Sequence, residues 1–101
     1  MNGKIGLELE KLSRAAAEQV AGHDAVERVE VERGEDAYER PVYHFDFLID
    51  QPRARQREGL IRTRLVQKLR DDLVERGDGH LPVIQIFSRE DWNKRKNARP
   101  L

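Results

Sequence analysis

The chain has 101 residues, of which 38% are hydrophobic and 38% are charged, and it contains no cysteine. This length fits a single domain with a small core, and the lack of thiols excludes disulfides and thiolate metal sites. The formal net charge is zero, yet residues 1–50 carry 6 Lys and Arg against 12 Asp and Glu, whereas residues 51–101 carry 13 against 7. This split predicts an acidic end and a basic end.

The sequence also indicates where the protein resides. No apolar run approaches the roughly 20 residues that a membrane-spanning helix needs. The first residues lead into a charged helical pattern rather than into the apolar core of a signal peptide. We therefore expect a soluble protein of the cytoplasm.

The first predicted element is a helix over about residues 5–21, because hydrophobic residues recur there at spacings of three and four. They are Ile5, Leu9, Leu12, Ala16 and Val20. A strand over about 25–33 follows, in which valines alternate with charged residues. The turn residues at 34–37 predict a hairpin to the next strand.

The strand predicted over about 41–50 carries the strongest local pattern. Its alternate residues Tyr43, Phe45, Phe47 and Ile49 are all large and hydrophobic. Such residues pack well on the buried side of a sheet, and a shift of one residue would expose all of them. We expect them to face the core and the strand to be central.

A long helix is predicted next, ending near Arg76, with a hydrophobic stripe of leucines and Ile61. The segment Gly77-Asp78-Gly79 is typical of a helix stop. Leu81 to Phe87 then forms a third strand, and since neither of its faces is polar we expect it inside the sheet. Ser88 resembles the N-cap of a short terminal helix that holds Trp92.

These elements predict a two-layer α+β fold in the order α-β-β-α-β. The first two strands would be antiparallel, and a right-handed crossover would make the second and third parallel. Both long helices would cover one face of this three-stranded mixed sheet. We expect one domain over residues 1–92 and a basic, flexible tail over residues 93–101.

Arg53, Arg55 and Arg57 lie at the start of the long helix, where cations are disfavoured by about 0.3–1 kcal/mol each. A bound phosphate, a nucleic-acid backbone or a partner's carboxylates would explain them. The alternative is a solvated loop over 50–58, with the helix starting at Gly59 or Leu60. The acidic hairpin of a second copy is a further candidate partner for these charges.

The sheet face opposite the core would carry Val42, His44, Asp46 and Leu48. We expect this face to be exposed and to bind a partner, because mixed faces with apolar patches are common docking surfaces.

The sequence indicates neither a metal site nor a cofactor. His23, His44 and His80 would have to converge to bind a metal, and a His44 that hydrogen-bonds Asp46 or a neighbouring strand is the simpler explanation. No nucleophile elbow, phosphate loop or dinucleotide motif is present. We therefore assign no catalytic residues and favour a non-enzymatic protein. A third hypothesis is an enzyme around His44 and Asp46, which would need a pocket over that sheet face.

The tail carries Lys94, Arg95, Lys96 and Arg99. These cations could bind nucleic acid by counterion release, but a solvated terminus is the simpler explanation. The isoelectric point near 6.8 argues against a dedicated nucleic-acid binder.

In element order the chain resembles KH-type RNA-binding domains, including ribosome-binding-factor-like ones, and the cytoplasmic domains of cation-efflux transporters. This resemblance is one of topology, so it assigns no residues. The leading hypothesis is a non-enzymatic domain of unknown function that acts through protein–protein contacts, as a homodimer in one version. The alternative is an RNA or phosphate-ligand binding domain that uses the Arg53–Arg57 segment.

Overall fold

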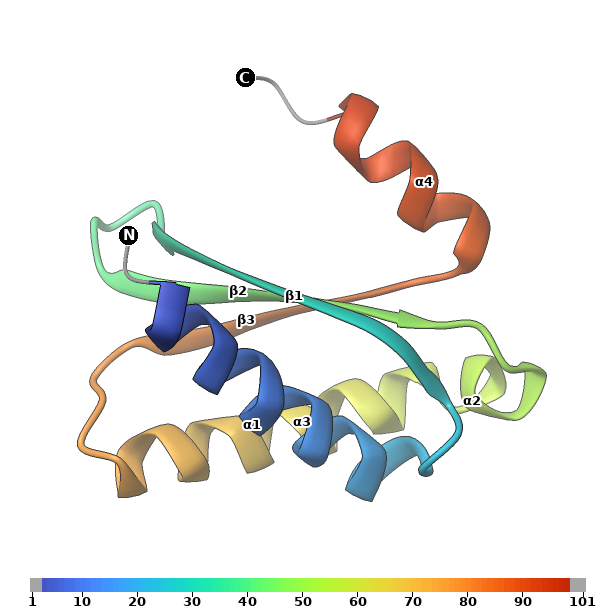
Figure 1. Ribbon diagram of the computed structural model, residues 1–101, viewed down its shortest axis with the longest axis horizontal. Helices are drawn as coiled ribbons and strands as arrows, with labels where there is room; N and C mark the ends of the chain where they lie inside the picture. Colours follow the sequence, from blue (N-terminus) through green and yellow to red (C-terminus); the bar gives the residue numbers. More distant parts are fainter. Residues whose placement is uncertain (1–2, 99–101) are drawn as a thin grey trace.

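The computed structural model describes residues 3–98 and the side-chain surroundings of residues 6–95 (Figure 1). The elements are α1 (Gly3–Ala21), β1 (Val26–Glu35), β2 (Pro41–Ile49), α2 (Pro52–Gln56), α3 (Glu58–Glu75), β3 (Leu81–Phe87) and α4 (Arg89–Ala98). The two long helices, α1 and α3, lie on one face of the sheet, and α4 lies on the other (Figure 1). The predicted α+β fold with a three-stranded mixed sheet is therefore confirmed.

The strand order is β1-β2-β3, so β2 is central as predicted. It pairs antiparallel with β1, where Val31 is opposite Phe45, and parallel with β3, where Phe45 is opposite Ile84. The prediction that β3 is an interior strand is wrong, because it lies at the edge. Its apolar residues are explained by helices on both faces: Ile84 is buried in the main core, and Phe87 packs edge-on against Trp92 of α4, with ring centroids 5.9 Å apart.

The core lies between the sheet and the two long helices. Tyr43, Phe45, Phe47 and Ile49 are all 3% exposed or less, which confirms that they face inward together. The helices contribute their hydrophobic stripes, among them Leu9 and Ala16 of α1 and Ile61, Leu65, Leu69 and Leu73 of α3. Burial of each large side chain contributes about 1.5–3 kcal/mol. The alternation in β2 and the spacing of four in α3 place these side chains on one side of each element, so the sheet and the helices pack as two layers.

The segment before α3 is neither a loop nor part of one continuous helix. Pro52 begins the five-residue helix α2, and Arg57 then breaks the helical geometry with φ −110° and ψ 17°. Proline suits the first position of a helix because its missing N–H would have no partner there. Ala54 is the buried residue of α2, and it anchors this turn to the core.

The end of α3 follows the predicted stop. Gly77 has φ +73°, and its N–H donates to the carbonyl of Val74 at 2.9 Å, while the N–H of Asp78 donates to that of Leu73 at 2.9 Å. This pair of hydrogen bonds is the Schellman arrangement, which places a left-handed residue directly after the helix.

Two glycine substitutions test this description of α3. Gly77→Ala is expected to lower the free energy of unfolding by about 1–2 kcal/mol, because a Cβ disfavours the left-handed conformation. Gly59 lies within α3 with open space around it, so Gly59→Ala should raise stability by about 0.5 kcal/mol. Urea unfolding followed by circular dichroism measures both changes. Equal effects at the two sites would contradict the assigned helix end.

The predicted flexible tail is helical as far as Ala98, because residues 93–98 continue α4. Ser88 acts as the expected N-cap, since its Oγ accepts the N–H of Asp91 at 3.2 Å. Arg99 lies outside the described residues. Trp92 of the expected terminal helix is 5% exposed, and the polar sequence after it contains a second buried side chain, Arg95, which is 6% exposed.

Candidate functional site

The three arginines of the Arg53–Arg57 segment do not act as one group. Arg55 forms an ion pair with Asp50, with 3.2 Å between Nη1 and Oδ1. Arg53 and Arg57 are exposed, and neither has an acidic partner within the part of the chain that the structure describes. Only these two are therefore available to an external anion.

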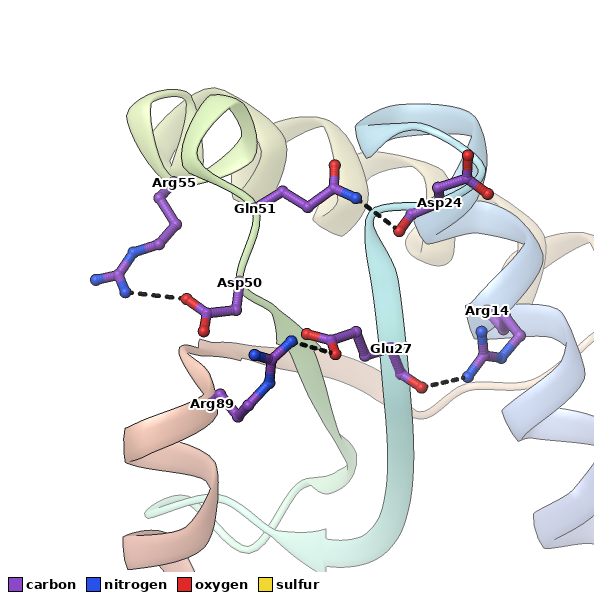
Figure 2. A network of polar contacts seen from close by, with 7 residues as sticks. All are labelled: Arg14, Asp24, Glu27, Asp50, Gln51, Arg55 and Arg89. Carbon is purple, nitrogen blue, oxygen red and sulfur yellow. Dashed lines mark hydrogen bonds and ion pairs between the residues drawn. The ribbon is translucent and has the colours of Figure 1, made fainter.

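Asp50 belongs to a polar network that joins the end of β2 to the starts of β1, α2 and α4 (Figure 2). The backbone N–H of Arg89 and the guanidinium of Arg55 hold the pKa of Asp50 below its usual value. The side chain of Arg89 reaches Glu27 at 2.7 Å, and Gln51 donates to the carbonyl of Asp24 at 2.9 Å. This network holds the start of α4 against the end of β2, and Arg55 stabilises it through its ion pair with Asp50.

The sheet face predicted to bind a partner is mostly buried, and α4 lies on this face (Figure 1). Val42, Asp46 and Leu48 are 1%, 3% and 5% exposed, and His44 is half-buried. Arg95 donates to Asp46 at 2.7 Å and also contacts Glu30. The expectation of an open face is therefore wrong for three of its four residues, and the binding of a partner by these residues stays a prediction.

Arg95 is the residue that attaches α4 to this face. Its guanidinium lies 3.6 Å from the ring centroid of Trp92, so it is enclosed between an aromatic face and two carboxylates. Removing a charge from water costs several kcal/mol unless good partners replace the water. The signal in the sequence was Asp46, since a carboxylate within an apolar strand requires a cation.

A second polar cluster ties the end of α3 to the middle of the sheet. Asp78 accepts the hydroxyl hydrogen of Tyr43 at 2.6 Å and the N–H of His80 at 3.0 Å, and the Nδ1 of His80 lies 2.6 Å from its carboxylate. The rings of His80 and Tyr43 stack with centroids 4.1 Å apart. These groups line a shallow hollow of about 510 Å³ together with Arg33 and Arg76.

The cluster shifts two pKa values. Burial and the hydrogen bond to Asp78 raise the pKa of Tyr43. Burial acts to raise the pKa of Asp78, but the hydrogen bonds from Tyr43 and His80 outweigh it, so the pKa is lowered overall. Because the three side chains satisfy one another, we read the cluster as a link between the α3–β3 loop and β2.

Tyr43→Phe tests that link. The substitution removes one donor from Asp78 and should lower the free energy of unfolding by about 1–2 kcal/mol at neutral pH. The folded pKa of Asp78 lies below its unfolded value near 3.9. Its contribution is therefore present above about pH 4 and is lost as the pH falls through the folded pKa. Between about pH 4 and the folded pKa of Asp78, the free energy of unfolding of the variant should fall less steeply with decreasing pH than that of the wild type. The same pH dependence in both proteins would contradict the link.

The two outer edges of the sheet differ in how they are protected. In β1, six of the ten residues are charged, and a register irregularity lies between Val26 and Arg28. Arg14 of α1 donates to the carbonyls of Val26 and Glu27, each at 3.1 Å. Figure 2 shows the contact with Glu27. Charges, bulges and occupied carbonyls are the devices by which proteins prevent an edge strand from pairing with another chain.

The outer edge of β3, which we call the β3 edge (residues 81–87), lacks these devices. None of its seven residues is charged, and only Pro82, near the start, removes a donor. A groove of about 420 Å³ runs along Val83 to Phe87, between Arg62 of α3 and Asp91 of α4. Sequence reasoning missed this site because it placed β3 inside the sheet. The uncharged run was visible, but the strand order was not.

The remaining observations assign no further site. Comparison of the chain with protein-family models, with curated proteins and with solved structures found no match. Among the described residues, no three His, Asp or Glu side chains gather closely enough to hold a metal ion. Within residues 3–98, no helix combines the length and apolar character needed to cross a membrane.

Proposed function

We propose that this protein is a non-enzymatic domain that acts through protein–protein contacts, and that the β3 edge is its contact surface. The observation that carries the proposal is the contrast between the two edges of one sheet. β1 is charged and has Arg14 on its carbonyls, whereas β3 is uncharged and borders a groove. An uncharged strand edge is a template on which another chain can add a strand.

Strand addition explains features that a purely structural β3 would not need. A strand at a solvated edge normally carries charged residues that discourage aggregation. Val83, Ile86 and Phe87 are instead partly exposed along the groove. A partner strand would form hydrogen bonds with the outward N–H and C=O groups of β3 and would cover these side chains. Affinity would then come from the main chain, and specificity from the side chains of α3 and α4 on either side of the groove.

Site-specific photo-cross-linking tests the proposal. A photoreactive residue is placed at exposed Gln85 on β3 or, as a matched position, at exposed Arg28 on β1. In lysate of the source cells, the Gln85 position should give one defined adduct that excess wild-type protein suppresses, and the Arg28 position should not. The purified partner should then bind Gln85→Lys at least about tenfold more weakly, since a charge on the edge opposes pairing. Equal adducts at both positions, or none, would contradict the proposal.

The second candidate function is binding of RNA or of a phosphate ligand, favoured by the unpaired state of Arg53 and Arg57 in the described region. Against it, the GxxG spacing of Gly3 and Gly6 lies inside helix α1, whereas KH modules use such a loop to clamp a nucleic-acid backbone. Binding by these arginines should fall steeply with salt and weaken in the Arg53→Ala, Arg57→Ala double variant. No retention of structured RNA at low salt would remove this candidate.

A further inference from the structure

We infer that the strand which adds to the β3 edge carries two acidic side chains four residues apart, with an apolar side chain midway between them, all facing α3. This inference rests on the proposed function, because it describes the partner of the same edge. It is drawn from the wall that α3 presents beside the groove.

Arg62 is the residue of α3 that lines the groove, and it begins a stripe of residues spaced by four along the helix: Arg62, Val66, Arg70 and Val74. Residues at this spacing follow one another along the same side of a helix, with a turn of about 40° at each step. Val66 is partly buried against the core, whereas Val74 is 70% exposed. The stripe is therefore cationic at two points and apolar between and beyond them.

Neither arginine is strongly held within the protein. Arg62 approaches Glu58 only at 3.5 Å, and both side chains are more than 40% exposed, so this ion pair contributes little. Arg70 is exposed and has no acidic partner among the residues that the structure describes. Both guanidinium groups are free to bind carboxylates of another chain.

The spacing of the two arginines matches an extended partner. They are eight residues apart, which is about 12 Å along a helix that rises 1.5 Å per residue. In a strand, residues i and i+4 point to the same side and lie about 13 Å apart. If residues i and i+4 of the partner strand face the two arginines, residue i+2 lies opposite Val66. The pattern acidic-x-apolar-x-acidic follows directly from this match.

The opposite wall sets what the intervening residues can be. Side chains at i+1 and i+3 point away from α3, toward the face where Phe87 and Asp91 lie. An apolar residue suits this face, whereas an acidic one would meet the carboxylate of Asp91. Acidic side chains are therefore favoured only at those positions of the partner strand that face α3.

A second copy of this chain fits the groove less well. If two β3 edges paired antiparallel about a two-fold axis, the two α3 helices would also lie antiparallel. With the axis beside Val66, Arg62 of one copy would face Arg70 of the other, and like charges across an interface disfavour association. A partner that brings carboxylates is favoured over self-association for this reason.

Peptide binding to the full chain tests the inference. The probe is the fluorescently labelled, end-blocked peptide Thr-Glu-Val-Val-Val-Glu-Thr (the glutamate peptide), and its counterpart has lysine in place of both glutamates (the lysine peptide). The glutamate peptide should bind about five- to tenfold more tightly, which is the effect of two exposed ion pairs. Arg70→Glu should remove this preference, because the wall would then carry one positive and one negative charge. Arg64→Glu, two residues and hence about 200° around α3 from Val66, should leave it unchanged.

The outcomes separate the inference from the proposed function. If both peptides bind with equal affinity and Gln85→Lys weakens both, the β3 edge is a contact site but the inferred acidic partner is wrong. If neither peptide binds and cross-linking at Gln85 also gives no adduct, both fail. If the Gln85 adduct is a second copy of this chain, the contact function stands and the inferred occupant is overturned.

Discussion

Replacing Arg95 by alanine is expected to lower the free energy of unfolding by about 3–5 kcal/mol. This is the usual effect of removing one partner from a buried ion pair, because the other charge is left without compensation. Both side chains, Arg95 and Asp46, are 5% exposed, and Glu30 and the ring of Trp92 complete the enclosure. A chain of this length has a total stability of only about 5–15 kcal/mol, so this loss is a large share.

Urea unfolding should be followed both by circular dichroism and by the fluorescence of Trp92, the single tryptophan. Lys94→Ala is the matched control, because the Lys94–Glu90 pair is 69% and 77% exposed and its loss should leave stability nearly unchanged. The double variant Arg95→Met, Asp46→Leu should recover most of the loss, since an apolar pair of similar size leaves no buried charge. Equal stability of wild type and Arg95→Ala would mean that α4 does not rest on this face.

Phe45→Ala is expected to cost about 3–5 kcal/mol, the usual loss for truncation of a fully buried phenylalanine. Phe45 is 0% exposed, with the Tyr43 and Phe47 rings on either side at centroid distances of 6.1 and 6.4 Å. The cavity would open at the centre of the central strand, where neighbours from both long helices meet, so little of it can be refilled.

The same urea titration measures this effect. Phe45→Leu keeps most of the volume and should cost less than about 1.5 kcal/mol, so the site stays measurable even if the alanine variant fails to fold. Tyr38→Ala serves as the control, because Tyr38 is 79% exposed in the hairpin and should shift stability by at most about 0.5 kcal/mol. Similar losses for Tyr38→Ala and Phe45→Ala would place the aromatic side of β2 away from the core.

The sequence was informative wherever one strong periodic pattern decided the structure. The alternation of Tyr43, Phe45 and Phe47 predicted both the buried side of β2 and its central place, and the structure confirms both. The helix stop at Gly77 was equally readable, because a glycine after the last apolar residue of a stripe has few other uses.

The sequence was uninformative for β3, because a strand that is apolar on both faces can be covered either by neighbouring strands or by helices. β3 was expected inside the sheet because neither of its faces is polar, but the second covering layer is α4 rather than another strand. A short terminal helix with Trp92 was expected, but the rest of α4 was taken for a tail, since Arg95 stands among exposed charges and only its tertiary contact with Asp46 distinguishes it. Both errors concern long-range contacts, which periodicity within a segment does not encode.

The candidate site depended on those same long-range contacts. Arg55 was grouped with Arg53 and Arg57, although its ion pair with Asp50 gives it a structural task. The unprotected edge emerged only when the strand order was known, because the same seven residues would be unremarkable in an interior strand.

The most direct test of the open β3 edge is a nuclear magnetic resonance titration of the isotope-labelled full chain with the glutamate peptide. Backbone amide signals of residues 83–87 and of the α3 segment 62–70 should shift together, while those of β1 residues 28–34 stay in place. Shifts centred on β1, or scattered over no continuous surface, would show that the β3 edge does not receive a strand.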